Sequence, residues 1–164
     1  MVDEQDNLSG FGVFENYKLI LEDEIVTMLY LSGMLIDKKY QGKNISQEII
    51  KSVFKQVNSD LISLRTQNIA MARSLLNLFS ENLFEMPNNV NKDILKYLRK
   101  IEPFKNINEF GIIKNCYTNQ LYYDLSAIKN NFNLDLTQND VLAVVIKPNK
   151  NKEKNYLHEK NYIT

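Results

Sequence analysis

The sequence predicts an α/β (α+β) fold, a mixed and largely antiparallel twisted sheet that contains one parallel strand pair and is flanked by helices. Two apolar segments on either side of Asp23-Glu24 indicate an antiparallel hairpin. Strand-like residues before and after an amphipathic helix that begins at Ile45 indicate a strand–helix–strand unit, whose two strands run parallel. The apolar run Val141–Ile146 predicts a buried strand. A length of 164 residues suits a single domain, residues 1–164, around these elements.

The composition argues against several classes of function. Twenty basic and twenty acidic residues cancel, so no overall positive field favours nucleic acid or an anionic membrane. Cys116 is the one cysteine and His158 the one histidine, which excludes an internal disulfide and argues against a Cys/His zinc site. No apolar stretch approaches the roughly 20 residues that span a bilayer. Residues 1–7 are acidic and polar, unlike a secretory signal. We therefore expect a cytoplasmic protein without a metal.

The first part of the chain predicts strands. Phe11–Phe14 is a short strand candidate, and Tyr17–Leu21 is either a second strand or its continuation after a turn at Glu15-Asn16. The hairpin turn then leads into a strand over Ile25–Leu31, whose end overlaps the apolar run Tyr30–Ile36. Gly33 within this apolar run indicates either a β-bulge or a close approach of another backbone or a ligand.

Helical periodicity predicts the next elements. A helix runs from Ile45 to near Asn58, a strand covers Leu61–Arg65, and Asn68 is expected to cap a second helix. The side chains expected to face the core from these two helices are Ile45, Ile49, Ile50, Val53, Phe54, Val57, Met71, Leu75, Leu76, Phe79 and Leu83.

The second half of the chain predicts a third helix over Lys92–Ile101 and a hairpin between residues 110–117 and 120–123. A short helix over residues 126–132 and the buried strand 141–146 follow. Residues 1–9 and 149–164 are polar, and we expect both ends to be loose.

Tyr30–Val53 contains the pattern that says most about function. An apolar strand leads into the turn Tyr40-Gln41-Gly42-Lys43-Asn44, and a helix follows at once. A helix start offers unpaired backbone N–H groups and the positive end of the helix dipole, which favour a phosphate or pyrophosphate. The alternative is an ordinary capped helix start, with Asn44 as N-cap and Gln47 three residues later. The glycine patterns of P-loop and Rossmann phosphate sites are absent from the sequence.

Leu35–Ser46 resembles the acyl-CoA-binding motif of the GNAT superfamily of N-acetyltransferases. In that motif a strand is followed by Gln/Arg-x-x-Gly-x-Gly/Ala and a helix. Gln41 matches the first position, whereas Asn44 and Ser46 replace the two glycines. Residues 61–68 are similar to the family's next strand and to the Asn that opens its next helix. The resemblance covers roughly residues 11–84, with a looser match of residues 135–146 to a late strand.

The resemblance implies a site for acetyl-CoA or another acyl-CoA as cosubstrate. Main-chain groups of the strand would bond the pantetheine arm, amides of the turn would hold the pyrophosphate, and the later Asn would contact the pantetheine. These roles fall on Met34, Leu35 and Ile36 in the strand, on Gln41, Gly42, Lys43, Asn44, Ile45 and Ser46 in the turn, and on Asn68. Lys43 would add a charge-assisted contact.

The resemblance leaves two functions open. One is an N-acetyltransferase-like protein that moves an acetyl group from acetyl-CoA to an unidentified amine. The other is a non-catalytic CoA-binding or regulatory module on a degenerate GNAT scaffold. The family's catalytic Glu falls near Ser32 or Gly33, and its general-acid Tyr falls at Leu75, so the catalytic residues are unknown. Any catalysis would therefore rest mainly on positioning and on backbone amides that polarise the thioester carbonyl.

The expected partner is a small-molecule or protein amine, and neither nucleic acid nor a membrane. Family members carry a strand and two helices ahead of the strand that Tyr17 begins here, and those helices shape the acceptor pocket. The resemblance therefore implies that the wall of the acceptor site is missing, is supplied by a second copy or a partner chain, or is rebuilt from residues 88–140.

Overall fold

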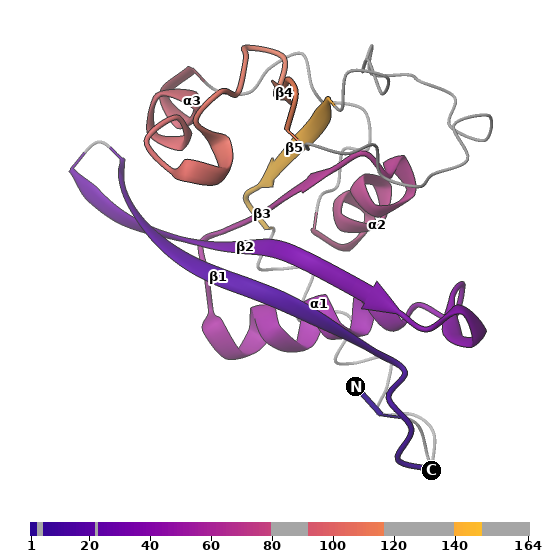
Figure 1. The fold of residues 1–164 in the computed structure, drawn as a ribbon. Coiled ribbons are helices and arrows are strands. Elements are labelled where there is room, and N and C mark those ends of the chain that lie inside the picture. The colour runs from indigo at the N-terminus through magenta and orange to yellow at the C-terminus, as the bar shows by residue number, and fades with distance from the viewer. Residues whose placement is uncertain (3–4, 22, 80–91, 117–139, 149–164) are drawn as a thin grey trace.

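The structure is a computed structural model that describes residues 1–2, 5–21, 23–79, 92–116 and 140–148. These residues form a mixed sheet of order β1-β2-β3-β5-β4 with helices on both faces (Figure 1). Its strands are β1 Gly10–Leu21, β2 Glu24–Ile36, β3 Leu61–Thr66, β4 Ile112–Ile113 and β5 Val141–Ile146. Only β2 and β3 pair in parallel among the described strands, which confirms the predicted fold class.

The N-terminal hairpin is longer than its sequence pattern indicates. β1 is one strand that pairs antiparallel with β2 along its whole length. Glu15 and Asn16 form no turn, because pairing with Tyr30 and Leu29 holds them extended and their side chains remain exposed. The chain reverses instead between the two strands, where Asp23 has a φ of 66°.

β2 carries a bulge beside Gly33, the first of the two roles considered for this glycine. Pairing with β1 skips Ser32, which is therefore the extra residue. The bulge changes which side chains share a face: Leu31 and Met34, three residues apart, both pack against the same core cluster. The parallel ladder with β3 ends at the same place, and its last pair is Leu31 with Leu64. Beyond that pair the two strands separate (Figure 1).

β3 connects the N-terminal hairpin to the rest of the sheet. Its parallel pairing with β2 confirms the predicted strand–helix–strand unit, and β5 has the predicted bounds. Of the strand predicted over residues 110–117, the structure describes β4 alone, which pairs with β5, while Ile113 also bridges Ile107. Ile112 and Ile113 are buried in the core clusters on the two faces of the sheet, and the predicted hairpin partner falls outside the described part of the chain. Residues 117–123 lie outside the described residues.

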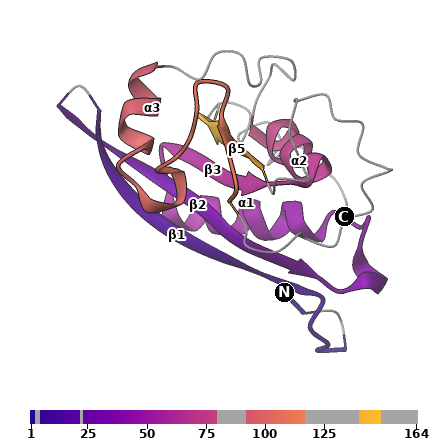
Figure 2. The same ribbon diagram turned by 45° about the horizontal axis from the view of Figure 1, so that its top comes forward.

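One face of the sheet is covered by α1, Ile45–Val57, and α2, Ile69–Phe79. α1 lies against β1 and β2, and α2 against β3 and β5 (Figures 1 and 2). The predicted start of α1 is confirmed, and Asn58 closes it in the left-handed conformation. Ile50 and Leu75 are fully buried on this face, as predicted. Val57 is 37% exposed, contrary to prediction, because the helix ends there.

The opposite face is covered by α3, Lys92–Leu98, and the 3₁₀ turn η2, Glu102–Phe104. Leu98 and Phe104 pack there with Tyr30. The third helix ends three residues before the predicted Ile101, whose amide donates to the Leu98 carbonyl at 2.9 Å in a tighter turn. Pro103 lies in the first turn of η2, where its missing amide leaves no helical hydrogen bond unmade.

The N-terminus closes a loop onto the start of β1. The terminal ammonium donates to the Gly10 carbonyl at 2.9 Å, and Val2 forms a bridge with Leu8. The sequence also predicts that residues 1–9 are loose, which is a statement about their motion, and it stays a prediction. The helix expected at 126–132 and the tail 149–164 lie outside the described residues. Within the described ranges, no helix is both long and apolar enough to cross a membrane.

Candidate functional site

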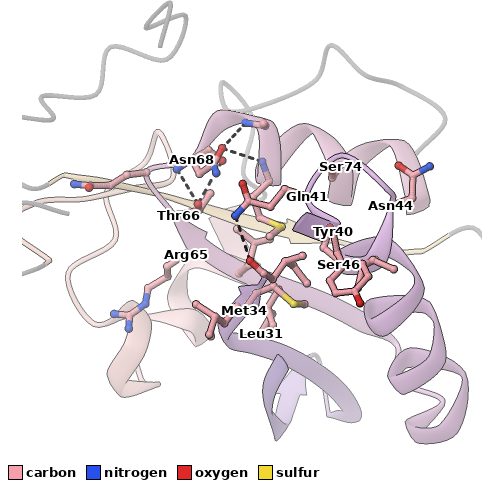
Figure 3. A pocket seen from close by; sticks show the side chains of 18 of the residues that line it. Leu31, Met34, Tyr40, Gln41, Asn44, Ser46, Arg65, Thr66, Asn68 and Ser74 are labelled. Atoms are coloured by element: carbon pink, nitrogen blue, oxygen red, sulfur yellow. Dashed lines mark hydrogen bonds between the residues drawn. The ribbon is translucent and has the colours of Figure 1, made fainter. Parts of the chain in front are cut away.

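A cavity of about 610 Å³ opens where β2 and β3 separate (Figure 3). One wall is β2 from Leu31 to Ile36, and the facing wall is the end of β3 with the corner that follows it, residues 64–68. The turn before α1, the start of α1 and the first turns of α2 complete the cavity. Its volume lies within the range of sites that hold small molecules and cofactors.

The structure brings all but one of the predicted site residues together around this cavity. Those that line it are Met34, Leu35, Ile36, Gln41, Gly42, Asn44, Ile45, Ser46 and Asn68. Lys43 is not among the residues that line it. Its ammonium lies 5.3 Å from the centre of the Tyr40 ring, which draws the side chain toward the turn itself.

The turn before α1 is built around two left-handed residues. It follows the short 3₁₀ helix η1, Lys38–Tyr40. Gly42 has a φ of 78°, and Asn44 has a φ of 60°. Asn44 therefore adopts a backbone conformation that glycine takes most easily and that Asn tolerates better than most residues.

Asn44 occupies the N-cap position of α1, as the ordinary helix-start alternative expects, but the side-chain cap of that alternative is absent. Its side chain makes no capping hydrogen bond. The helix ladder begins with the Glu48 amide, which donates to the Asn44 carbonyl at 3.1 Å. Within the described residues, the amides of Ile45, Ser46 and Gln47 form no hydrogen bond. The first turn of α1 thus offers its donors and its dipole to the cavity.

Two predicted amide donors are used within the turn. The Gln41 amide donates to the Lys38 carbonyl, and the Lys43 amide donates to the Tyr40 carbonyl, both at 3.3 Å. The Gln41 side chain donates to the Ile36 carbonyl at 3.2 Å and so joins the turn to the end of β2 (Figure 3). The amides that remain for a ligand therefore lie in Gly42 and from Asn44 onward.

The start of α2 is capped, in contrast to that of α1. Asn68 Oδ1 accepts from the amides of Ala70 at 2.9 Å and Met71 at 3.3 Å, which confirms the predicted N-cap (Figure 3). Thr66 Oγ1 accepts from the Asn68 amide at 2.8 Å and holds the cap in place. Because Oδ1 is engaged with the helix, Asn68 can serve a ligand through its Nδ2 donor.

The sequence argument missed part of the lining. Tyr40, Thr66, Gln67 and Ser74 also line the cavity, as do Leu31, Ser32, Gly33, Leu64, Arg65, Ala70 and Met71. Helical periodicity could have found Ala70, Met71 and Ser74, since positions 70, 71 and 74 lie on one side of a helix that starts beside Asn68. The contribution of β3 could not be read locally, because it depends on where the parallel ladder ends.

Arg65 connects the cavity to the opposite face of the sheet. Its guanidinium donates to the Tyr30 hydroxyl at 2.7 Å, to the Pro103 carbonyl at 2.9 Å and to Cys116 Sγ at 3.3 Å. Burial raises the pKa of the Tyr30 hydroxyl, and the Arg65 charge opposes that rise. Burial likewise raises the pKa of the Cys116 thiol, which favours the neutral packed form over a nucleophilic thiolate.

The ionisable side chains that line the cavity are few. Among the described residues, Tyr40 and Arg65 line it, and no carboxylate, imidazole or thiol does. Ser32 Oγ donates to the Val13 carbonyl at 3.2 Å, and Leu75 is wholly buried in the core. Neither position therefore supplies the acid or base that the family places there. In the described part of the chain, no cluster of His, Cys, Asp or Glu is arranged to hold a metal ion.

A comparison with solved structures finds a distant likeness, whereas the sequence comparisons find none. No protein-family model matches this chain, and no curated protein matches its sequence. A chain from a crystal structure of the NatC complex bound to Gag peptide and CoA superposes with a TM-score of 0.45 at 12% identity, over 90% of this chain and 69% of that one. The fold class assigned here stands on the order and pairing of the strands alone.

Substitution of Asn68 and substitution of Asn44 should affect the free energy of unfolding differently. Asn68→Ala removes a cap and should lower the free energy of unfolding by about 1 kcal/mol. Asn44→Gly should leave stability unchanged or raise it, because glycine takes the left-handed conformation without strain. Urea denaturation at neutral pH measures both. A loss of about 1 kcal/mol in Asn44→Gly would contradict the uncapped geometry of α1.

The free energy of unfolding should fall at alkaline pH because the hydroxyl of Tyr17 has a raised pKa in the folded protein. Burial, followed by the hydrogen bond to Glu15, raises the pKa of Tyr17 to about 12 from its ordinary value of 10.0. Above pH 10 the unfolded chain therefore binds fewer protons at Tyr17 than the folded chain, so stability is lost as the pH rises toward 12. Urea denaturation at pH 9 and pH 11 should show this fall, and Tyr17→Phe should make it shallower. An unchanged slope in the variant would exclude this contribution.

Proposed function

We propose that this chain binds acetyl-CoA or another acyl-CoA in the cavity between β2 and β3 and transfers the acetyl group to an amine. The observation that carries the proposal is the meeting, in one cavity, of two separated strand edges and an uncapped helix start. A CoA molecule has two parts with matching needs: an extended pantetheine arm with peptide-like amides, and a pyrophosphate.

The separated strands suit the pantetheine arm. Beyond Leu31, β2 pairs with β1 along one edge, while its other edge faces the cavity instead of β3. An extended ligand with amide groups can hydrogen-bond to such an edge as an added strand would. Met34 to Ile36 are the residues of β2 that the resemblance assigns to this role, and all three line the cavity.

The start of α1 suits the pyrophosphate. The amides from Asn44 to Gln47 lie at the positive end of the α1 dipole, and no side chain of the described turn caps them. Ser46 is small and half-buried at this point, so it leaves the backbone accessible. The α2 start is already satisfied by Asn68, which makes α1 the better place for an anion.

Transfer in this site would work through positioning. The acceptor nitrogen attacks the thioester carbon, the carbon–sulfur bond breaks, and the thiolate of CoA leaves and takes up a proton. The nitrogen loses its proton to water or to the leaving thiolate, because the described lining residues offer no carboxylate or imidazole base. Holding the two reactants in line and polarising the carbonyl with a backbone amide lower the barrier without either group.

A second function, a non-catalytic CoA-binding or regulatory module, is favoured by that same lack of an acid or base in the described lining. It makes the same use of the cavity and differs only in the absence of turnover. In both cases we propose a cytoplasmic protein. For the acetyltransferase function we also propose an acceptor, which is an amine-bearing small molecule or protein. We further propose that a second copy or a partner chain lies at the acceptor side.

Isothermal titration should show that CoA and acetyl-CoA bind, and that Ser46→Glu weakens both at least about tenfold. The introduced carboxylate lies where the pyrophosphate is proposed to bind and repels it. The same carboxylate in the first turn of a helix favours the helix dipole, so folding should be preserved. Ser52→Glu, on an exposed position of the same helix, is the matched control and should bind as the unaltered chain does. Absence of binding by the unaltered chain at millimolar ligand would end the proposal.

Turnover should reveal a reaction without an enzymatic base. Amines are screened with acetyl-CoA, and the reaction is measured by the appearance of the free CoA thiol. The rate should rise about tenfold per pH unit up to the pKa of the acceptor amine. A plateau below the pKa of the amine would indicate a general base outside the described residues. Binding of CoA without any thiol release from a broad amine set would favour the module.

A further inference from the structure

Two lysines gather on one aromatic ring at the edge of the cavity. Lys39 Nζ lies 4.8 Å from the centre of the Tyr40 ring, and Lys43 Nζ lies 5.3 Å from it. Both lysine side chains are exposed, while Tyr40 is half-buried and lines the cavity beside the start of α1. The ring thus holds two ammonium groups close to the place proposed for the pyrophosphate.

Two acidic side chains of the neighbouring sequence, Asp37 and Glu48, have contacts of their own. Asp37 Oδ1 accepts from the Lys39 amide at 2.9 Å as the cap of η1. Glu48, in the first turn of α1, forms an ion pair with Lys51 at 3.7 Å. Lys38 adds a third exposed lysine to the same turn. The segment from Asp37 to Asn44 therefore carries more positive than negative charge, although the whole chain has a formal net charge of zero.

We propose that Lys39 and Lys43, held on the Tyr40 ring, bind the 3′-phosphate of the CoA nucleotide and so select CoA over its dephosphorylated form. This inference rests on the proposed function and adds a specificity to it. A phosphate monoester carries nearly two negative charges at neutral pH and accepts hydrogen bonds from several ammonium groups at once. The pyrophosphate at the start of α1 and a phosphate on the adjoining ribose are joined by only a few bonds. The two anionic groups would thus match the two positive features of the turn.

Titration of CoA and of dephospho-CoA, which lacks only the 3′-phosphate, tests the inference. The unaltered chain should bind CoA at least about tenfold more tightly at low salt, and the preference should shrink as ionic strength rises. Lys39→Gln combined with Lys43→Gln should weaken CoA about tenfold and leave dephospho-CoA nearly unchanged. Lys55→Gln combined with Lys96→Gln removes the same charge from exposed positions on α1 and α3 and should keep the preference. Thermal melting of each variant checks that the fold is retained.

The outcomes separate the two proposals. Equal affinity of the unaltered chain for both ligands overturns this inference and leaves CoA binding in place. Equal weakening of both ligands in the Lys39 and Lys43 variant also overturns it, because the lysines would then act on the shared pyrophosphate. Binding of neither ligand by the unaltered chain overturns the proposed function, and this inference with it.

Discussion

The bulge at Ser32 is the constraint on which the site depends. It places an extra residue in β2 at the point where the parallel ladder with β3 ends, so the two strands separate instead of pairing to their ends. In a strand–helix–strand unit the chain leaves both parallel strands at the same edge of the sheet. The turn into α1 and the corner into α2 therefore meet at the gap, and each supplies a helix start to the same cavity. A regular ladder would fill this space with backbone hydrogen bonds.

The two helix starts differ in whether a side chain caps them, and the place proposed for the pyrophosphate rests on that difference. Asn68 accepts from the first amides of α2 through its side chain, so that end of the helix is satisfied by the protein itself. Asn44 is left-handed and makes no cap, so the first amides of α1 stay available. The same residue type thus has two roles, because the backbone preceding α1 turns through Gly42 and Asn44 while the backbone preceding α2 leaves an extended strand. The cavity is electrostatically uneven as a result.

Arg65 sets the character of the other side of the gap. Its bonds to Tyr30, Pro103 and Cys116 join β2, η2 and the residues after β4 around the end of β3. This network lies beside the cavity: Arg65 lines the cavity, Tyr30 and Cys116 do not, and burial raises the pKa of the Tyr30 hydroxyl and of the Cys116 thiol. Among the described residues that line the cavity there is no carboxylate, imidazole or thiol, and both proposed functions start from that observation.

Local sequence patterns determined the bounds of α1 and β5, the N-terminal hairpin, the parallel pair and the cap at Asn68, and they offered the bulge as one of two roles for Gly33. Each of these depends on side-chain periodicity or on one residue's backbone preference, which are written in neighbouring residues. The same patterns, with the resemblance, named most of the cavity lining in β2 and the turn. The continuity of β1 through Glu15 and Asn16 was decided by its pairing with β2, and the partner of β4 by burial against β5. The conformation of Asn44, the place of Lys43 on the Tyr40 ring and the contribution of β3 were decided in the same way. Tertiary structure settles such features because they depend on residues far apart in the chain, whose contacts exist only once the sheet has formed.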